Sequence, residues 1–208
     1  MSDHATLDAL ILDFGGVLFL PHNSPERQRW LDRIGWENEA FEAWMWSQPE
    51  ALAAMRGELT EAEFWTGIGA QVGLSAEDSL AMAADYWAGD ELNMGAVALA
   101  RRAREHGLRT GLLSNAYSDL GPYLAKHGLL ELFDECIISA LVGKIKPDLA
   151  IYELACSTLQ VQPQRALFVD DNWANVEAAR AHGLHALHYV GPETLAKASV
   201  VLGLPQEP

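Results

Sequence analysis

The sequence is short of basic residues, and this shortage argues against two broad classes of function. Its 208 residues contain 14 Lys and Arg against 29 Asp and Glu, a formal net charge of -15 at pH 7. Nucleic-acid binding needs clustered Lys and Arg that neutralise phosphates, so we expect no nucleic-acid partner. The same negative charge disfavours docking on an anionic membrane surface.

Cysteines and long apolar runs are scarce as well. Two cysteines, Cys136 and Cys156, cannot by themselves form a disulfide framework or a four-ligand zinc site. No apolar run reaches the roughly 18 to 20 residues that span a bilayer, and the segment MSDHATLDAL lacks the basic start of a signal peptide. We therefore expect a soluble, reduced, cytoplasmic protein with no membrane partner.

The rest of the composition is that of a folded domain. Half of the residues are apolar and 21% are charged, so the chain can bury a core. Apolar runs alternate with amphipathic segments, which predicts a mostly parallel sheet covered by helices on both faces. We expect strands within residues 7–16, 108–115, 136–140, 166–171 and 185–190, and helices at 97–107, 119–128, 147–159 and 173–183.

A helical insertion interrupts this alternation at residues 20–91, where no convincing strand pattern occurs. Ser24 and Pro25 begin a helix that Gly35 ends, and the motifs TEAE and SAED each mark a further helix start. The insertion holds 14 acidic and 4 basic residues, so most of the negative charge belongs to it. Its six tryptophans are expected mainly to build its core, with one or two facing a ligand.

Polar side chains collect where the predicted strands end. Because ligands of open α/β sheets bind beyond the carboxyl ends of the strands, these side chains are candidates for one site. Carboxylates can hold Mg²⁺, a hydroxyl and an ammonium can hold a phosphoryl group, and a carboxylate can attack phosphorus. The residues are Asp13, Ser114, Asn115, Lys146, Asp170 and Asp171.

Most of these residues also have an ordinary structural explanation. An Asp or a Ser-Asn pair after a strand is commonly a turn or a helix cap. Lys146 fits neither role, because it stands between Ile145 and Pro147. The structural explanation would have to hold at four strand ends at once, so we favour the functional one.

The same residues resemble the four motifs of the haloacid dehalogenase-like hydrolases. LILDFGGVLF matches the first motif, GLLSN the second, GKIKPD the third and LFVDDNWANVEAA the fourth, in order over about residues 8 to 182. The resemblance implies an α/β Rossmann-like core formed by residues 1–19 and 92–208, with an α-helical cap at 20–91. It also implies a Mg²⁺-dependent phosphatase of a small phosphorylated metabolite, either a monomer or a homodimer.

The resemblance assigns a role to each matching residue. Asp13 would be the nucleophile and a Mg²⁺ ligand, together with the Gly15 carbonyl and Asp171, while Asp170 would ligate beside them or through water. Ser114, Asn115 and Lys146 would hold the phosphate. Asn175 stands where relatives often have an acidic residue. Trp173 is expected at the edge of the pocket, and Arg56 of the cap could contact an anionic substrate.

One position departs from the family's phosphatase pattern. Gly15 stands where an aspartate usually acts as the general acid and base, a role that typically contributes about 10²–10⁴-fold to the rate. A 2-haloacid dehalogenase and a non-catalytic phosphate-binding protein therefore remain alternatives. The adjacent Asp170 and Asp171 favour the metal-dependent phosphatase, because two like charges repel unless a cation lies between them.

Overall fold

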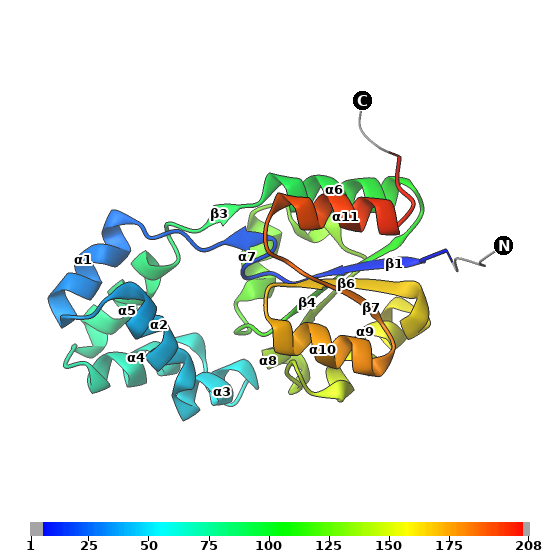
Figure 1. The fold of residues 1–208 in the computed structure, drawn as a ribbon. Helices are drawn as coiled ribbons and strands as arrows, with labels where there is room; N and C mark the ends of the chain where they lie inside the picture. Colours follow the sequence, from blue (N-terminus) through cyan, green and yellow to red (C-terminus); the bar gives the residue numbers. More distant parts are fainter. Residues whose placement is uncertain (1–5, 206–208) are drawn as a thin grey trace.

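A five-stranded parallel sheet forms the centre of the molecule (Figure 1). The structure is a computed structural model that describes residues 6–205. The strand order is β5-β4-β1-β6-β7, and every neighbouring pair is parallel. The strands are β1 (Ala9–Leu12), β4 (Arg109–Ser114), β5 (Glu135–Ile138), β6 (Ala166–Asp170) and β7 (His185–His188). The predicted α/β class is confirmed.

Helices cover both faces of this sheet, because successive apolar residues of each strand point to opposite sides. Leu10 and Leu12 of β1 pack into one core, whereas Ala9 and Ile11 pack into the other. The first face carries α6 (Met94–Glu105), α7 (Leu120–Lys126) and α11 (Pro192–Val201), and the second carries α9 (Leu149–Leu159) and α10 (Trp173–His182). Among residues 6–205, no helix combines the length and apolar composition needed to cross a bilayer.

Five helices form a separate lobe, on the left in Figure 1, with an aromatic core of its own. Ser24 caps the first, with Pro25 at its first turn and Gly35 in the left-handed conformation at its end. The TEAE motif forms a complete capping box, and the Ser75 side chain of SAED caps the last helix. The helices are α1 (Pro25–Ile34), α2 (Asn38–Ser47), α3 (Pro49–Met55), α4 (Glu61–Gln71) and α5 (Ala76–Tyr86).

A two-stranded antiparallel ribbon, β2 (Phe19–Leu20) and β3 (Glu91–Leu92), joins the lobe to the core. The expectation of no strand in residues 20–91 is therefore wrong at both ends of that range. Two-residue strands carry too little periodicity to be recognised. We keep residues 20–91 as the proposed cap, with its boundaries inside this ribbon.

Two further elements differ from the sequence predictions. The strand expected at residues 136–140 ends at Ile138, and Ser139–Val142 form the short helix α8. The Ser139 hydroxyl accepts a hydrogen bond from the Ala116 N–H at 3.0 Å, a long-range contact that draws the chain out of the sheet. Helix α11 is not among the predicted helices, although Gly191 at its N-cap and Pro192 at its first position are a typical helix start.

A buried arginine holds the cap together. Arg27 is 1% exposed, and its guanidinium contacts Glu42 at 3.3 Å and Asp90 at 3.4 Å. It also donates to the Tyr86 carbonyl at 2.9 Å and lies over the Tyr86 ring. Arg27 of α1 thereby contacts α2, α5 and Asp90, the residue that precedes β3 of the ribbon.

We expect Arg27→Ala to lower the free energy of unfolding by about 3–5 kcal/mol, because it leaves two carboxylates without their buried partner. Chemical denaturation followed by circular dichroism measures this loss. The matched control is Arg29→Ala, which removes an exposed ion pair with Asp85 and should cost about 0–1 kcal/mol. Equal losses in the two variants would contradict the structural role given to Arg27.

Candidate active site

Three neighbouring strands deliver the candidate residues to one edge of the sheet. β1 leads into Asp13, β4 ends at Ser114, and β6 ends at Asp170. Since β1 lies between β4 and β6 in parallel register, these side chains meet at the carboxyl ends of the strands. Asp13, Ser114 and Asp170 are all buried.

Lys146 lies at the centre of this cluster. It is 3% exposed, and its Nζ is 2.8 Å from Asp13 Oδ1 and 2.6 Å from Asp170 Oδ2. Two carboxylates therefore compensate the cost of burying its ammonium. The Lys146 side chain thereby joins the loop before α9 to Asp13, which lies 133 residues earlier in the chain.

The Asn115 side chain is bonded to the backbone of Lys146. Its Oδ1 accepts from the Lys146 N–H at 2.8 Å, and its Nδ2 donates to the Lys146 carbonyl at 2.9 Å. Both ends of the amide are thus used to hold the lysine backbone. This side chain therefore positions Lys146, and a contact of Asn115 with phosphate stays a prediction.

Asp170 and Asp171 differ sharply in their surroundings. Asp170 is fully buried and accepts hydrogen bonds from Asn175 Nδ2 at 3.1 Å and from the Asn172 N–H at 2.8 Å, besides its contact with Lys146. Asp171 is exposed. Asp171 therefore has the more accessible carboxylate of the two.

These carboxylates fit a divalent cation. Oxygens of Asp13, Asp170 and Asp171 lie within 4.8 Å of one another. Lys146 supplies one positive charge against their three negative charges. Hard oxygen donors at this spacing, with excess negative charge, suit Mg²⁺.

The electrostatics of Asp13 lead to the same conclusion. Burial, with Asp170 and Asp171 nearby, raises its pKa to about 8, although Lys146 acts in the opposite direction. Although Asp171 as a residue is exposed, partial burial of its carboxyl group and the charge of Asp170 also raise its pKa. Without a further cation the cluster tends to keep protons, so a bound cation would favour the ionised form of Asp13.

Two glycines after Asp13 shape the site in different ways. Gly16 has a φ of +74°, and a Cβ there would overlap the Asp171 carboxylate. A Cβ on Gly15 would meet nothing within 4 Å. The sequence pattern does not show that Gly16 makes room for Asp171.

The Asp171 backbone also forms a contact that the sequence does not reveal. His188, at the end of β7, has Nε2 2.8 Å from the Asp171 carbonyl oxygen. His188 supports the loop and is not part of the carboxylate cluster. Only the parallel pairing of β6 with β7 brings His188 next to this loop.

The remaining candidates lie at the periphery. Trp173 is 50% exposed and packs edge-to-face on His188, with Arg180 over its ring. Arg56 is exposed at the end of α3, beside Gly57, where cap and core backbones approach closely at Ala140. Their roles toward a substrate stay predictions.

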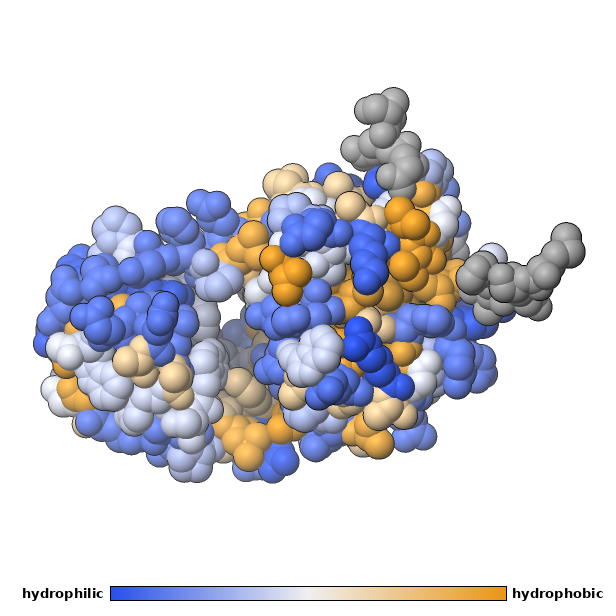
Figure 2. Space-filling model, in the orientation of Figure 1, coloured by the Kyte–Doolittle hydropathy of each residue, from blue (hydrophilic) through white to orange (hydrophobic). Residues whose placement is uncertain are grey.

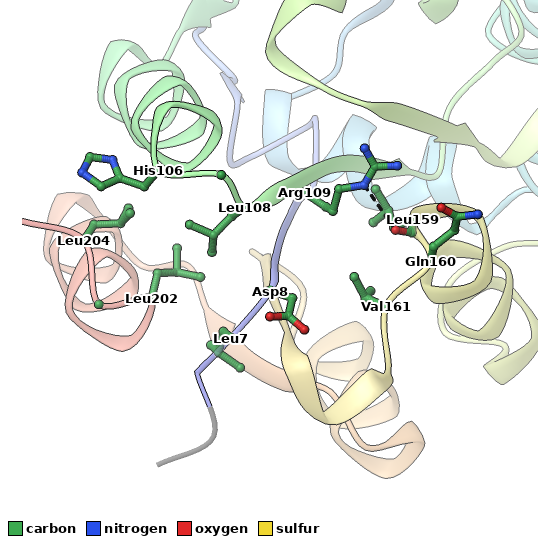
Figure 3. Close-up of a pocket in the computed structure, with 12 residues that line it drawn as sticks. Leu7, Asp8, His106, Leu108, Arg109, Leu159, Gln160, Val161, Leu202 and Leu204 are labelled. Atoms are coloured by element: carbon green, nitrogen blue, oxygen red, sulfur yellow. Dashed lines mark hydrogen bonds between the residues drawn. The ribbon is translucent and has the colours of Figure 1, made fainter. Parts of the chain in front are cut away.

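A separate cavity of about 590 Å³ lies at the opposite, amino-terminal end of the strands (Figure 3). Asp8 and Arg109, drawn there, flank the starts of β1 and β4. Both are engaged elsewhere: Asp8 pairs with Arg165, and Arg109 lies 3.6 Å from Asp134. This cavity lies away from the carboxylate cluster.

The chain is similar to known hydrolases over most of its length. A model of the haloacid dehalogenase-like hydrolases matches residues 7–183. A sesquiterpene phosphatase of Aspergillus oryzae is 29% identical over 184 residues, which cover 88% of this chain and 90% of that protein. A phosphoserine phosphatase of Thermus thermophilus is 33% identical over 168 residues, 76% of this chain and 66% of that protein.

A solved structure has the same fold. A haloacid dehalogenase family enzyme of Bacteroides thetaiotaomicron, in complex with magnesium and inorganic phosphate, matches with a TM-score of 0.70. The match covers 88% of this chain and 93% of that one, at 21% sequence identity. At this identity the likeness shows the fold and leaves the chemistry to the residues of the site.

We expect Gly16→Ala to weaken Mg²⁺ binding by at least about tenfold, a loss of about 1.4 kcal/mol, because the new Cβ displaces Asp171. Calorimetric titration with Mg²⁺ measures the effect. Gly15→Ala is the matched control, since its Cβ enters open space and its carbonyl is kept. An unchanged affinity in Gly16→Ala would show that Asp171 is not a ligand.

The raised pKa of Asp13 predicts a pH dependence. A protonated carboxyl must lose its proton before it binds a cation, so Mg²⁺ affinity should rise with pH up to about 8 and then level off. Titrations between about pH 6 and about pH 8, in buffers of different ionisation enthalpy, would also detect the released proton. A constant affinity without proton release would contradict the assignment.

Proposed function

This chain belongs to the haloacid dehalogenase-like hydrolases, and we propose that it is a Mg²⁺-dependent phosphatase of a small phosphorylated metabolite. The observation that carries the proposal is a cluster of three carboxylates, of which the two buried ones, Asp13 and Asp170, contact Lys146. A metal-free dehalogenase would have no use for Asp171 beside Asp170. The phosphatase relatives and the magnesium–phosphate complex of the family enzyme support the same reaction.

Asp13 is the nucleophile in this proposal. Its Oδ1 accepts from Lys146 Nζ at 2.8 Å and from the Phe14 N–H at 2.7 Å, which fixes the orientation of the carboxylate. We assign the attack on phosphorus to Oδ2. A P–O bond forms to Asp13 while the bond to the leaving alcohol breaks, and water then hydrolyses the aspartyl-phosphate.

The neighbouring side chains hold the phosphoryl group. Lys146 offers an ammonium next to the nucleophile, and Ser114 a hydroxyl at the end of the adjacent strand. Asp13, Asp171 and the Gly15 carbonyl would hold Mg²⁺, with Asp170 beside them. The cation supplies charge withdrawal from the phosphoryl oxygens when it is bound. Asn115 acts indirectly, by fixing the Lys146 backbone.

Gly15 determines which esters react fastest. Without a carboxyl at this position, the leaving oxygen receives no proton from the usual group. The rate of hydrolysis falls least for esters of acidic alcohols, acyl phosphates and anomeric sugar phosphates. It falls most for simple alkyl esters. The preferred substrate should therefore have a good leaving group.

Hydrolysis of p-nitrophenyl phosphate tests the proposal. We expect release of nitrophenol that requires added Mg²⁺, and its loss by more than about 10³-fold in Asp13→Asn, which removes the nucleophile. Metal-dependent turnover that survives in Asp13→Asn would overturn the assignment. If the wild-type protein releases no nitrophenol but converts a 2-haloacid, the dehalogenase alternative is correct.

Restoring the missing carboxyl is a second test. Because open space surrounds Gly15, we expect Gly15→Asp to fold and to accelerate alkyl phosphate hydrolysis by at least about tenfold, with a smaller gain for p-nitrophenyl phosphate. The measurement is kcat/KM for both esters in both proteins, with Gly15→Asn as the control that cannot donate the proton. Equal gains in the two variants would rule out proton donation as the cause.

A further inference from the structure

A second cavity, of about 510 Å³, lies between the cap and the core. Its walls come from the start of α4, the end of α5, the ribbon and the first turn of α7. Figure 2 shows the surface hollowed between the cap on the left and the core, under the ribbon. The cavity lies near the loop that follows Asp13. Phe19 of its wall stacks on Phe14, the residue after Asp13, with ring centres 5.1 Å apart.

Four aromatic side chains line this cavity from both sides. Trp65 and Trp87 come from the cap, with their rings edge-to-face at 6.2 Å. Phe19 and Tyr123 come from the core side, with ring centres 5.6 Å apart. Aromatic faces attract cations, and most strongly where water is excluded.

The charged residues of the wall are all acidic. They are Glu61, Asp90 and Asp119, and none of the twelve lining residues is Lys, Arg or His. Asp90 is paired with Arg27. Within residues 6–205, neither Glu61 nor Asp119 forms an ion pair. Burial and the charge of Asp119 raise the pKa of Glu61, whereas the indole N–H groups of Trp65 and Trp87 act in the opposite direction.

A buried donor in the same wall also lacks a partner. Trp65 is 0% exposed, and its indole N–H makes no hydrogen bond in the described structure. The indole N–H groups of Trp65 and Trp87 are both directed at the Glu61 carboxylate and lower its pKa, although the Trp65 N–H does not reach hydrogen-bonding geometry with it. A buried N–H without an acceptor costs free energy, which a ligand oxygen would recover.

We propose that this cavity binds the alcohol part of the substrate, and that this part carries an ammonium group on a short stem. The inference rests on the proposed phosphatase function and names its substrate class. The ammonium lies between the aromatic rings and next to Glu61 and Asp119, and the ester or a hydroxyl oxygen accepts from Trp65. A cationic substituent also makes the alcohol more acidic, which suits a site that has Gly15 in place of an acid.

Other substrate classes fit the cavity less well. A leaving group with a carboxylate or a second phosphate would be repelled by Glu61 and Asp119. An apolar leaving group, such as a terpenoid alcohol, would bury both carboxylates without a counter-ion. A sugar could donate to them but would leave their charge uncompensated.

The test compares two esters of the same shape, choline phosphate and 3,3-dimethylbutyl phosphate, in which carbon replaces the charged nitrogen. Calorimetry with Mg²⁺ and the Asp13→Asn protein measures binding without turnover. We expect choline phosphate to bind at least about tenfold more tightly, a difference of about 1.4 kcal/mol. Equal binding, tighter binding of the neutral ester or of glycerol phosphate, or no binding of choline phosphate would overturn the inference.

Variants of the cavity identify the groups responsible. Glu61→Gln with Asp119→Asn should bring the ratio of the two affinities close to one, whereas Glu39→Gln removes an exposed cap charge away from the cavity and should preserve it. An unchanged ratio in the double variant would contradict the cavity as the ammonium site. Parallel assays with p-nitrophenyl phosphate separate the two hypotheses, because turnover without charge discrimination would leave the phosphatase intact and refute only this inference.

Discussion

The burial of one lysine between two carboxylates is the interaction on which the site depends. Lys146 is almost fully buried, and it can remain charged there only because Asp13 and Asp170 lie within 2.8 Å of its Nζ. The same contact leaves the cluster with more negative than positive charge once Asp171 is counted. The proposed roles of Asp13 as nucleophile and of Lys146 as phosphate ligand, and the proposed Mg²⁺ site, therefore have one electrostatic origin.

The fold supplies this cluster through chain direction and close packing. A parallel sheet with β1 between β4 and β6 brings three strand ends together, and apolar strands keep the polar groups at that edge. Details then set the geometry: Asn115 holds the lysine backbone, and Gly16 leaves room for Asp171. The cap adds a second, separate set of acids over the core, in keeping with its excess of acidic residues.

The sequence predicted the parts of the molecule that follow from local pattern. Strand ends, helix caps and the motif spacing located Asp13, Lys146 and Asp170 before any coordinates, because each stands directly after a recognisable element or inside a motif. The sequence pattern could not predict contacts between segments that are distant in the chain. The task of the Asn115 side chain, the exit of Ser139 from the sheet and the acidic cavity around Trp65 all depend on residues that approach only after folding.

The central claim is that Asp13 carries the phosphoryl group during turnover. The most direct measurement is acid quenching during p-nitrophenyl phosphate turnover, followed by borohydride reduction and peptide mass spectrometry. Borohydride converts an aspartyl-phosphate to homoserine, so the account predicts homoserine at position 13 only when Mg²⁺ and substrate are both present. Steady turnover with Asp13 unmodified, or with homoserine at Asp170 or Asp171 instead, would contradict it.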